Sequence, residues 1–256
     1  MIAMIGSGRT ASFSRISPLL LLVCFLFAGC SGADGSEESK FTADRKRMIV
    51  REIAGRDITD PAVLKAMGEV PRHLFVDPVF RSFAYADRPL PIRKNQSISQ
   101  PYIVALMTQL ARLKPSDSVL EIGTGSGYQA AVLGEIVRKV YGIEIIPELA
   151  FNAIQRLKEL EYVNVRVKQG DGFKGWPAYA PFDAILITAS APEIPQPLIE
   201  QLKVGGRMVL PLESKHGVQN LVVMTKTEKG LEKKFVTGVA FVPMTGEVRN
   251  REGKNP

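Results

Sequence analysis

The sequence has almost no cysteine or histidine, and this scarcity excludes several kinds of chemistry. Its two cysteines, Cys24 and Cys30, both lie in an apolar segment near the N-terminus, so the remainder has no disulfide framework, thiolate metal site or cysteine nucleophile. Of its two histidines, His73 has no second histidine or carboxylate at ligand spacing, and His216 lies in a polar turn. We therefore expect no metal site and a structural role for His73.

Dense basic runs interleaved with aromatic residues are also missing. The formal charge of +7 and the pI of about 9.4 raise the question of a nucleic-acid or anionic membrane partner. The positive residues are spread along the chain, which favours a solvated basic surface, and we expect no nucleic-acid partner. With 256 residues and 45% hydrophobic content, the chain can bury one substantial core.

The N-terminus has the pattern of an export signal. Residues 1–17 contain Arg9 and Arg15 and no acid, and an almost wholly apolar run follows at 18–28. This run is too short to span a bilayer comfortably and is typical of a signal-peptide core. Small residues then precede Cys30, which resembles the bacterial lipoprotein signal, in which the cysteine is lipidated after cleavage.

These patterns predict three segments, namely a signal peptide over 1–29, a flexible tether over 30–41 and a folded domain over 42–256. A lipid anchor at Cys30 would be the only membrane attachment and would place the domain in the cell envelope, facing the periplasm. The alternative is a mis-assigned start, with translation beginning nearer Met48 and a protein located in the cytoplasm.

The stretch 119–128 predicts a buried strand, a glycine turn and the start of a helix, an arrangement that presents bare backbone N–H groups to a nucleotide-like ligand. Gly123, Gly125 and Gly127 have the spacing G-x-G-x-G, which differs from the dinucleotide fingerprint G-x-G-x-x-G. A carboxylate at Glu121 would repel a pyrophosphate but suits the cationic S-adenosylmethionine. The alternative is a turn that only packs a helix on a strand.

Two further carboxylates follow later strands. Glu144 ends the next apolar run, where a carboxylate is suited to accept hydrogen bonds from ribose hydroxyls. Asp171 stands between two glycines after the third predicted strand, and it either accepts from an adenine amino group or caps a turn. With Glu121 and Thr188, these residues fall at the carboxyl ends of strands, where α/β sheets bind ligands.

Strands and helices alternate through the middle of the chain, and a hairpin closes the pattern. We expect seven strands, over 119–122, 140–143, 163–167, 182–188, 205–211, 219–225 and 235–243. This pattern predicts an α/β fold with a mostly parallel sheet, one antiparallel strand, and helices on both faces.

Helix signals precede the glycine turn. We expect a helix over 42–54 with Thr42 as N-cap, and a second helix, capped by Asp60, running through Met67. The polar stretch 95–102 then leads into a helix over 103–113, and backbone donors at such an N-terminus favour a carboxylate. Within that stretch, a serine at position 97 or 99 either caps the helix or has a functional role.

Several motifs point to one family. They are Asp60–Met67, Val70–Phe75, Ile98–Pro101, Val119–Tyr128, Gly170–Gly172, Pro181–Ile185, Gly205–Arg207 and Phe241–Thr245. The glycine turn is shared by most S-adenosylmethionine enzymes, whereas Ile98–Pro101 and the Val-Pro-Arg-His run from Val70 are far more specific. From about Thr42 to Val248, the chain resembles the protein-L-isoaspartate (D-aspartate) O-methyltransferases.

The resemblance implies a Rossmann-like class I S-adenosylmethionine-dependent methyltransferase fold with a seven-stranded sheet, so 42–256 would be the methyltransferase domain. It implies that Ser99 is the active-site serine and touches the substrate carboxylate. Residues implied to line the cofactor are Ile98, Gln100, Gly123, Gly125, Ser126, Glu144, Asp171, Gly172 and Thr245.

The implied reaction moves a methyl group from S-adenosylmethionine to the free α-carboxylate of an L-isoaspartyl residue in damaged proteins and peptides. The ester then closes to a succinimide, which can reopen as normal aspartate. Because a carboxylate, with a reference pKa of about 4, is already ionised near neutral pH, no general base is needed. This agrees with the lack of a His/Asp or Cys/His pair, and we expect a monomer acting on isoaspartyl partners.

Three alternatives remain. Amino-directed nucleic-acid methyltransferases carry a D/N-P-P-Y/F motif after the fourth strand, but residues 188–192 here read Thr-Ala-Ser-Ala-Pro. Cytosine C5 chemistry needs a cysteine that the domain lacks, so both observations speak against a nucleic-acid methyltransferase, which is the nearest enzyme alternative. The second alternative is a methyltransferase that acts on another substrate. The third is an inactive envelope lipoprotein that keeps the fold and binds S-adenosylmethionine.

Overall fold

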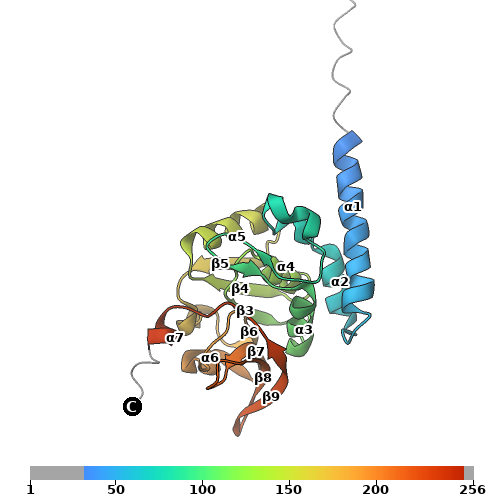
Figure 1. Cartoon of the computed structure of the whole chain (residues 1–256). Helices are drawn as coiled ribbons and strands as arrows, with labels where there is room; N and C mark the ends of the chain where they lie inside the picture. Colours follow the sequence, from blue (N-terminus) through green and yellow to red (C-terminus); the bar gives the residue numbers. More distant parts are fainter. Residues whose placement is uncertain (1–31, 251–256) are drawn as a thin grey trace, which may run out of the picture. The chain divides into compact units, whose positions relative to one another are not determined.

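A seven-stranded sheet forms the centre of the chain from Phe41 onward in the computed structural model, which describes residues 32–250 (Figure 1). The strand order is β5-β4-β3-β6-β7-β8-β9; the first five are mutually parallel, and β8 is antiparallel to both neighbours. The strands are β3 (Ser118–Ile122), β4 (Lys139–Glu144), β5 (Val165–Gln169), β6 (Phe182–Ile187), β7 (Leu202–Glu213), β8 (Gln219–Thr227) and β9 (Gly230–Val239). The predicted mostly parallel sheet is confirmed.

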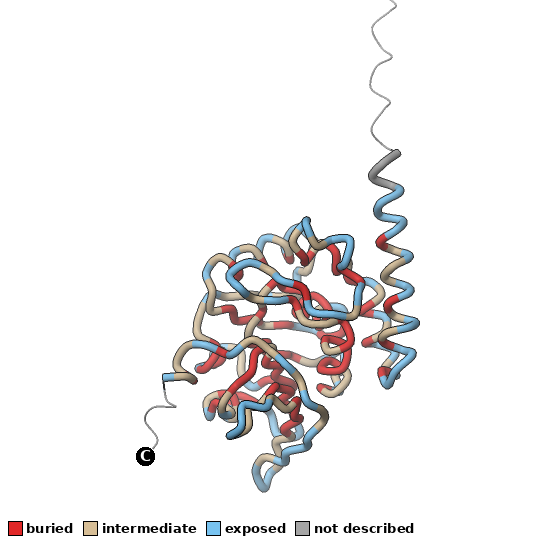
Figure 2. The backbone as a smooth tube through the Cα atoms, viewed as in Figure 1, coloured by how far each residue is buried: buried red, intermediate tan, exposed pale blue. Residues whose placement is uncertain are grey.

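The sheet carries a hydrophobic core on each face. All five residues of β3 are buried, as expected for a parallel strand covered on both sides. Val119 lies in register with Val140 and Ala184 and belongs to one core, while Leu120 and Ile185 belong to the other. In Figure 2 the buried positions accordingly concentrate in the central strands and the helices packed on them.

Helices cover both faces, as predicted. Those that share the core of Val119 are α2 (Pro61–Glu69), α3 (Pro101–Ala111), α4 (Tyr128–Gly134) and α5 (Pro147–Glu159). Those that share the core of Leu120 are α6 (Gln196–Gln201) and α7 (Glu247–Asn250). The predicted N-cap of α2 is confirmed, because the Asp60 carboxylate accepts hydrogen bonds from the backbone N–H groups of Ala62 (2.9 Å) and Val63 (3.4 Å).

A small antiparallel hairpin precedes α3 in a region with no predicted regular structure. It consists of β1 (Leu90–Pro91) and β2 (Ser97–Ile98), with Leu90 opposite Ile98. Short 3-10 turns complete the fold, at Arg72–Leu74, Pro78–Phe83, Gly172–Lys174 and Pro177–Tyr179.

The N-terminal region differs from the sequence-based expectation. Helix α1 spans Gly32–Met48 and continues as a π-helical turn, Ile49–Ile53, so the segment expected as a flexible tether, 30–41, is helical from residue 32. The predicted N-cap Thr42 lies inside α1. Residues 36–47 contain no proline or glycine, and the basic last turn complements the helix dipole, so local propensity favours the helix.

Two predicted features cannot be placed in this fold. The signal peptide, 1–29, and the lipidation site, Cys30, lie outside the described residues. Within 32–250, no helix has the length and apolar character needed to cross a bilayer. The backbone contacts divide the chain between Lys40 and Phe41, one residue from the predicted start of the folded domain.

Candidate active site

The glycine turn lies between β3 and α4, at the edge of the sheet where the parallel strands have their carboxyl ends. Gly123, Gly125 and Gly127 have φ angles of 89°, 55° and 90°, a left-handed conformation that favours glycine. The N–H group of Gly123 donates to the carbonyl oxygen of Ile143 on β4 at 2.8 Å. A Cβ atom at position 123 would lie 2.9 Å from the hydroxyl of Thr188, so the turn also has no room for a side chain there.

Glu144, the last residue of β4, fixes the turn through its side chain. One carboxylate oxygen accepts from the N–H of Gly125 at 2.8 Å, and the other accepts from the N–H of Ile146 at 2.9 Å, just before α5. The residue is 5% exposed. Each oxygen has a second lone pair, so Glu144 is placed to accept from a ligand hydroxyl at the carboxyl edge.

Glu121 lies deeper than the sequence indicated. It is 0% exposed, so its carboxyl group lies beneath the turn and is covered by neighbouring atoms. Among the described residues, neither of its oxygens has a hydrogen-bond partner. Burial raises its pKa to about 8, the Thr124 hydroxyl opposes this shift, and the nearby charge of Glu144 adds to it.

The hairpin β1–β2 lies against the glycine turn. The side chain of Ile92 would lie 3.7 Å from a Cβ atom at Gly125. The hairpin is also tied to α5, because Arg93 and Lys94 form ion pairs with Glu148 at 3.2 and 2.7 Å. The strand β2 ends one residue before Ser99, so the hairpin brings the Ser99 segment to the same edge of the sheet as the turn.

Ser99 is held by a buried arginine. Arg72, from the Val-Pro-Arg-His run, is 0% exposed and donates hydrogen bonds to the carbonyl oxygens of Ser99 and Ala84, both at 2.8 Å. Its guanidinium also lies over the ring of Tyr128, the first residue of α4, at 4.7 Å. Because α4 follows the glycine turn, Arg72 connects the serine to the turn by way of that ring.

The capping role considered for the serines is wrong. Gln100 is the N-cap residue of α3 and makes no side-chain cap hydrogen bond. Asp87 takes that role instead, because it accepts from the N–H of Tyr102 at 2.9 Å and from the Gln100 side chain at 2.7 Å. Within the described residues, the half-buried Ser99 hydroxyl has no hydrogen-bond partner, so it is available to a substrate.

Asp171 does cap a turn. Its carboxylate accepts from the N–H of Phe173 at 2.9 Å and from the N–H of Glu247, in the C-terminal region, at 2.7 Å. Both oxygens are therefore occupied by backbone donors, and any adenine contact would use their remaining lone pairs. Gly172 is needed because a Cβ atom there would lie 2.2 Å from the side chain of Ile122 at the end of β3.

The other predicted cofactor-lining residues differ in exposure. Ile98 (4% exposed) and Ser126 (8%) are buried, whereas Thr245 is exposed, between the buried Met244 and Gly246. His73 packs as expected, with its ring stacked on Phe41 at 4.2 Å. No group of histidine, cysteine, aspartate and glutamate side chains in residues 32–250 is arranged to hold a metal ion.

Sequence reasoning missed the supporting residues of this site. Asp87 lies in a stretch with no expected regular structure, and nothing local identifies it as the cap of a helix that begins fourteen residues later. Arg72 was visible only as part of a motif, without a role. A buried arginine that bonds to two carbonyl oxygens is recognised from the packing and not from the neighbouring sequence.

Together these features suit a cationic, nucleoside-like methyl donor. The turn offers close approach to the backbone, and two carboxyl groups, Glu121 and Glu144, lie beneath and beside it. Burial favours the neutral form of Glu121, and a cation bound at this edge would favour its ionised form. A pyrophosphate would be repelled by the same groups.

Comparisons with known proteins agree with this geometry. The family model described as Protein-L-isoaspartate(D-aspartate) O-methyltransferase matches residues 43–249. The Protein-L-isoaspartate O-methyltransferase 2 of Syntrophobacter fumaroxidans is 48% identical over 237 residues, which cover 88% of this chain and 96% of that protein. The protein of the same name from Pelobacter propionicus is 54% identical over 203 residues, covering 79% of this chain and 90% of that protein.

Solved structures show the same fold. One protein-L-isoaspartate O-methyltransferase superposes with a TM-score of 0.74 at 28% identity, covering 81% of this chain and 69% of that chain. A Plasmodium falciparum structure, solved in complex with S-adenosyl-L-homocysteine, gives a TM-score of 0.69 at 24% identity. That match covers 80% of this chain and 98% of the other.

The burial of Glu121 predicts how stability depends on pH. Its folded-state pKa of about 8 exceeds the ordinary carboxyl value, so the ligand-free protein loses stability as pH rises from about 4.5 to 8, by up to ~1.4 kcal/mol per pH unit. We expect Glu121→Gln, a neutral replacement of the same size, to raise the melting temperature at pH 8 and to change it little at pH 4.5. Equal effects at both pH values would contradict this assignment.

Proposed function

Because this chain belongs to the protein-L-isoaspartate(D-aspartate) O-methyltransferase family, we propose that Ser99 contacts the substrate at the carboxyl edge of its sheet. The enzyme transfers a methyl group from S-adenosylmethionine to the α-carboxylate of L-isoaspartyl residues, the first step of protein repair. The observation that carries the role of Ser99 is its hydroxyl, which is free of the capping bond and held beside the glycine turn through Arg72.

S-adenosylmethionine supplies an activated methyl group on a sulfonium. The residues of the chain bind and orient the two partners. Gly123 and Gly125 offer a side-chain-free surface, and Glu144 is placed to accept from ribose hydroxyls. A cation bound at this edge would favour the ionised form of the buried Glu121 beneath it. Asp171 and Gly172 follow β5, next to β4 in the sheet, and are proposed to line the cofactor together with Ile98, Gln100 and Ser126.

The chemical step needs positioning and no proton transfer. The substrate carboxylate is already ionised, and in-line alignment of oxygen, methyl and sulfur can supply roughly 7–11 kcal/mol of the barrier reduction. In this proposal the Ser99 hydroxyl donates to one carboxylate oxygen while the other attacks. Since a cation and an anion become neutral in the reaction, exclusion of water from the site favours it.

The first test uses the purified enzyme with S-adenosylmethionine carrying a labelled methyl group. Two peptides of identical sequence are compared, one with L-isoaspartate and one with normal aspartate. We expect base-labile label only on the isoaspartyl peptide, because only that linkage leaves an α-carboxylate next to the kinked backbone. Label on neither peptide, or on added nucleic acid instead, would contradict the proposal.

The second test changes Ser99 to alanine. Loss of a hydrogen bond to a charged group predicts a fall in kcat of about 10- to 100-fold, with S-adenosylhomocysteine binding changed by less than about twofold. Ser97→Ala is the matched control, since Ser97 is exposed and lies two residues before Ser99, on β2. An equal loss of turnover in both variants, or a parallel loss of cofactor binding in Ser99→Ala, would argue against a substrate-orienting hydroxyl.

For location, we propose an envelope lipoprotein, attached through Cys30 after removal of residues 1–29, whose domain acts as a monomer. The support is the basic start, the short apolar run and the small residues before the cysteine. The alternative is a cytoplasmic enzyme made from a later start.

This proposal is tested by fractionating cells that express the full chain. We expect the protein in the membrane fraction, and mass spectrometry should find an N-terminal peptide that begins with a lipid-modified Cys30. The Cys30→Ser variant should lack the lipid and leave the membrane fraction. An unmodified Met1, or a peptide beginning at Met48, would overturn the anchor.

A further inference from the structure

The segment after β9 crosses the carboxyl edge of the sheet, and we refer to residues 241–249 as the C-terminal strap (Figure 1). Ser190, in the loop after β6, holds it by two backbone bonds, donating to the carbonyl of Val242 at 2.9 Å and accepting from the N–H of Met244 at 2.8 Å. At its start, Phe241 exchanges two hydrogen bonds with the side chain of Gln219. The strap therefore runs beside the proposed site.

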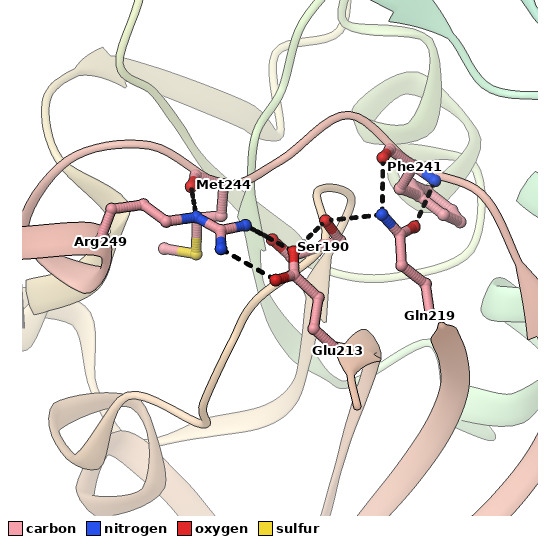
Figure 3. Close-up of polar contacts among 6 residues, drawn as sticks. All are labelled: Ser190, Glu213, Gln219, Phe241, Met244 and Arg249. Carbon is pink, nitrogen blue, oxygen red and sulfur yellow. Dashed lines mark hydrogen bonds and ion pairs between the residues drawn. The ribbon is translucent and has the colours of Figure 1, made fainter. Parts of the chain in front are cut away.

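An ion pair fastens the far end of the strap, as Figure 3 shows. The guanidinium of Arg249 binds both carboxylate oxygens of Glu213, the last residue of β7, with one of these bonds at 2.8 Å. Glu213 also accepts from the hydroxyl of Ser190 at 2.6 Å. The side chains of the pair are 27% and 20% exposed, and a two-pronged charged contact of this kind is stronger than a surface ion pair.

The same arginine closes a small loop. Its Nε atom donates to the carbonyl oxygen of Met244 at 3.0 Å, five residues back. Inside the loop, Gly246 has a φ of 94°, and a Cβ atom there would lie 2.5 Å from the carboxylate of Asp171. The loop is thus fixed at both ends and pressed against Asp171, with the exposed Thr245 at its tip.

We infer that Glu213 and Arg249 are positioning residues that hold the loop 244–247 as a fixed wall of the S-adenosylmethionine site. This inference rests on the proposed function, because the expected weakening of cofactor binding assumes that Thr245 in this loop lines the cofactor. Glu213 bonds to Ser190 and Arg249 bonds to Met244, so the pair acts on the strap and on the loop after β6, whereas Arg72 holds the Ser99 segment. Loosening the pair therefore weakens cofactor binding and leaves the alignment at Ser99 intact.

The cause is the entropy of the loop. Loop residues without such bonds are mobile, and a ligand that needs them ordered must then order them on binding. When the arginine and glutamate already fix the loop, binding of the ligand costs less conformational entropy. We expect removal of the pair to weaken binding about tenfold, which corresponds to about 1.4 kcal/mol.

The experiment measures S-adenosylhomocysteine binding by calorimetry in Glu213→Gln, Arg249→Met and the double variant, with the full chain and well below the melting temperature. Each single variant is expected to weaken binding about tenfold, Arg249→Met at least as much as Glu213→Gln, because it also removes the bond to Met244. The double variant is expected to be no weaker than Arg249→Met alone, because the arginine is then already detached from Glu213. In turnover assays the KM for S-adenosylmethionine rises by a similar factor, while kcat stays within about twofold. Arg249→Lys, which keeps the charge, should recover part of the loss.

Lys203→Met is the control, because it breaks an ion pair with Asp183 (2.6 Å) at the opposite end of β6. Wild-type binding in both single variants, equal weakening in the control, or additive losses in the double variant would overturn the inference. If Arg249→Met does not fold, Glu213→Gln and Arg249→Lys decide between the same outcomes. Calorimetry needs no methyl acceptor, so a failure of the isoaspartyl assay is distinguished from a failure of the inference about Glu213 and Arg249.

Discussion

This site depends on the two hydrogen bonds that the Glu144 carboxylate accepts from backbone N–H groups. By accepting from Gly125 and from Ile146, the carboxylate joins the glycine turn to the end of β4 and the approach to α5. Three of the five residues of the turn are glycines with positive φ angles, and backbone hydrogen bonds help to keep them in this left-handed conformation. The hairpin that leads to Ser99 rests against this turn, and its position follows from it.

The electrostatics of the edge select the ligand. Glu121 is sealed beneath the turn, and Glu144, also buried, lies beside it. A dinucleotide site places a pyrophosphate against its glycine turn, which the Glu144 carboxylate would repel, whereas the same carboxylate attracts a sulfonium and an ammonium. The acceptor is itself an anion, which explains why the fold manages without a histidine or cysteine base. The protein supplies charge and alignment, and the reactants supply the chemistry.

Long polar side chains fix the loops that surround this rigid sheet. Arg72 bonds to the backbone at Ser99, Asp87 to the start of α3, and Arg249 to the strap at Met244. The polar groups of a loop backbone have no partners in a strand or helix, so polar side chains form these hydrogen bonds instead. Each of these residues contributes to function through a backbone segment that it holds.

Local chemistry was enough for the sequence to determine the main features of the fold. Period-two and period-3.6 apolar patterns predicted the strands and helices, the glycine spacing predicted the turn, and the cap at Asp60 and the carboxylate of Glu144 at a strand end were placed correctly. Only the tertiary structure decided that Glu121 is fully enclosed, that Asp87 caps α3 in place of a serine, and that Arg249 meets Glu213 across 36 positions of sequence. Burial and such pairings depend on how the chain packs around the sheet, and no window of neighbouring residues contains that information.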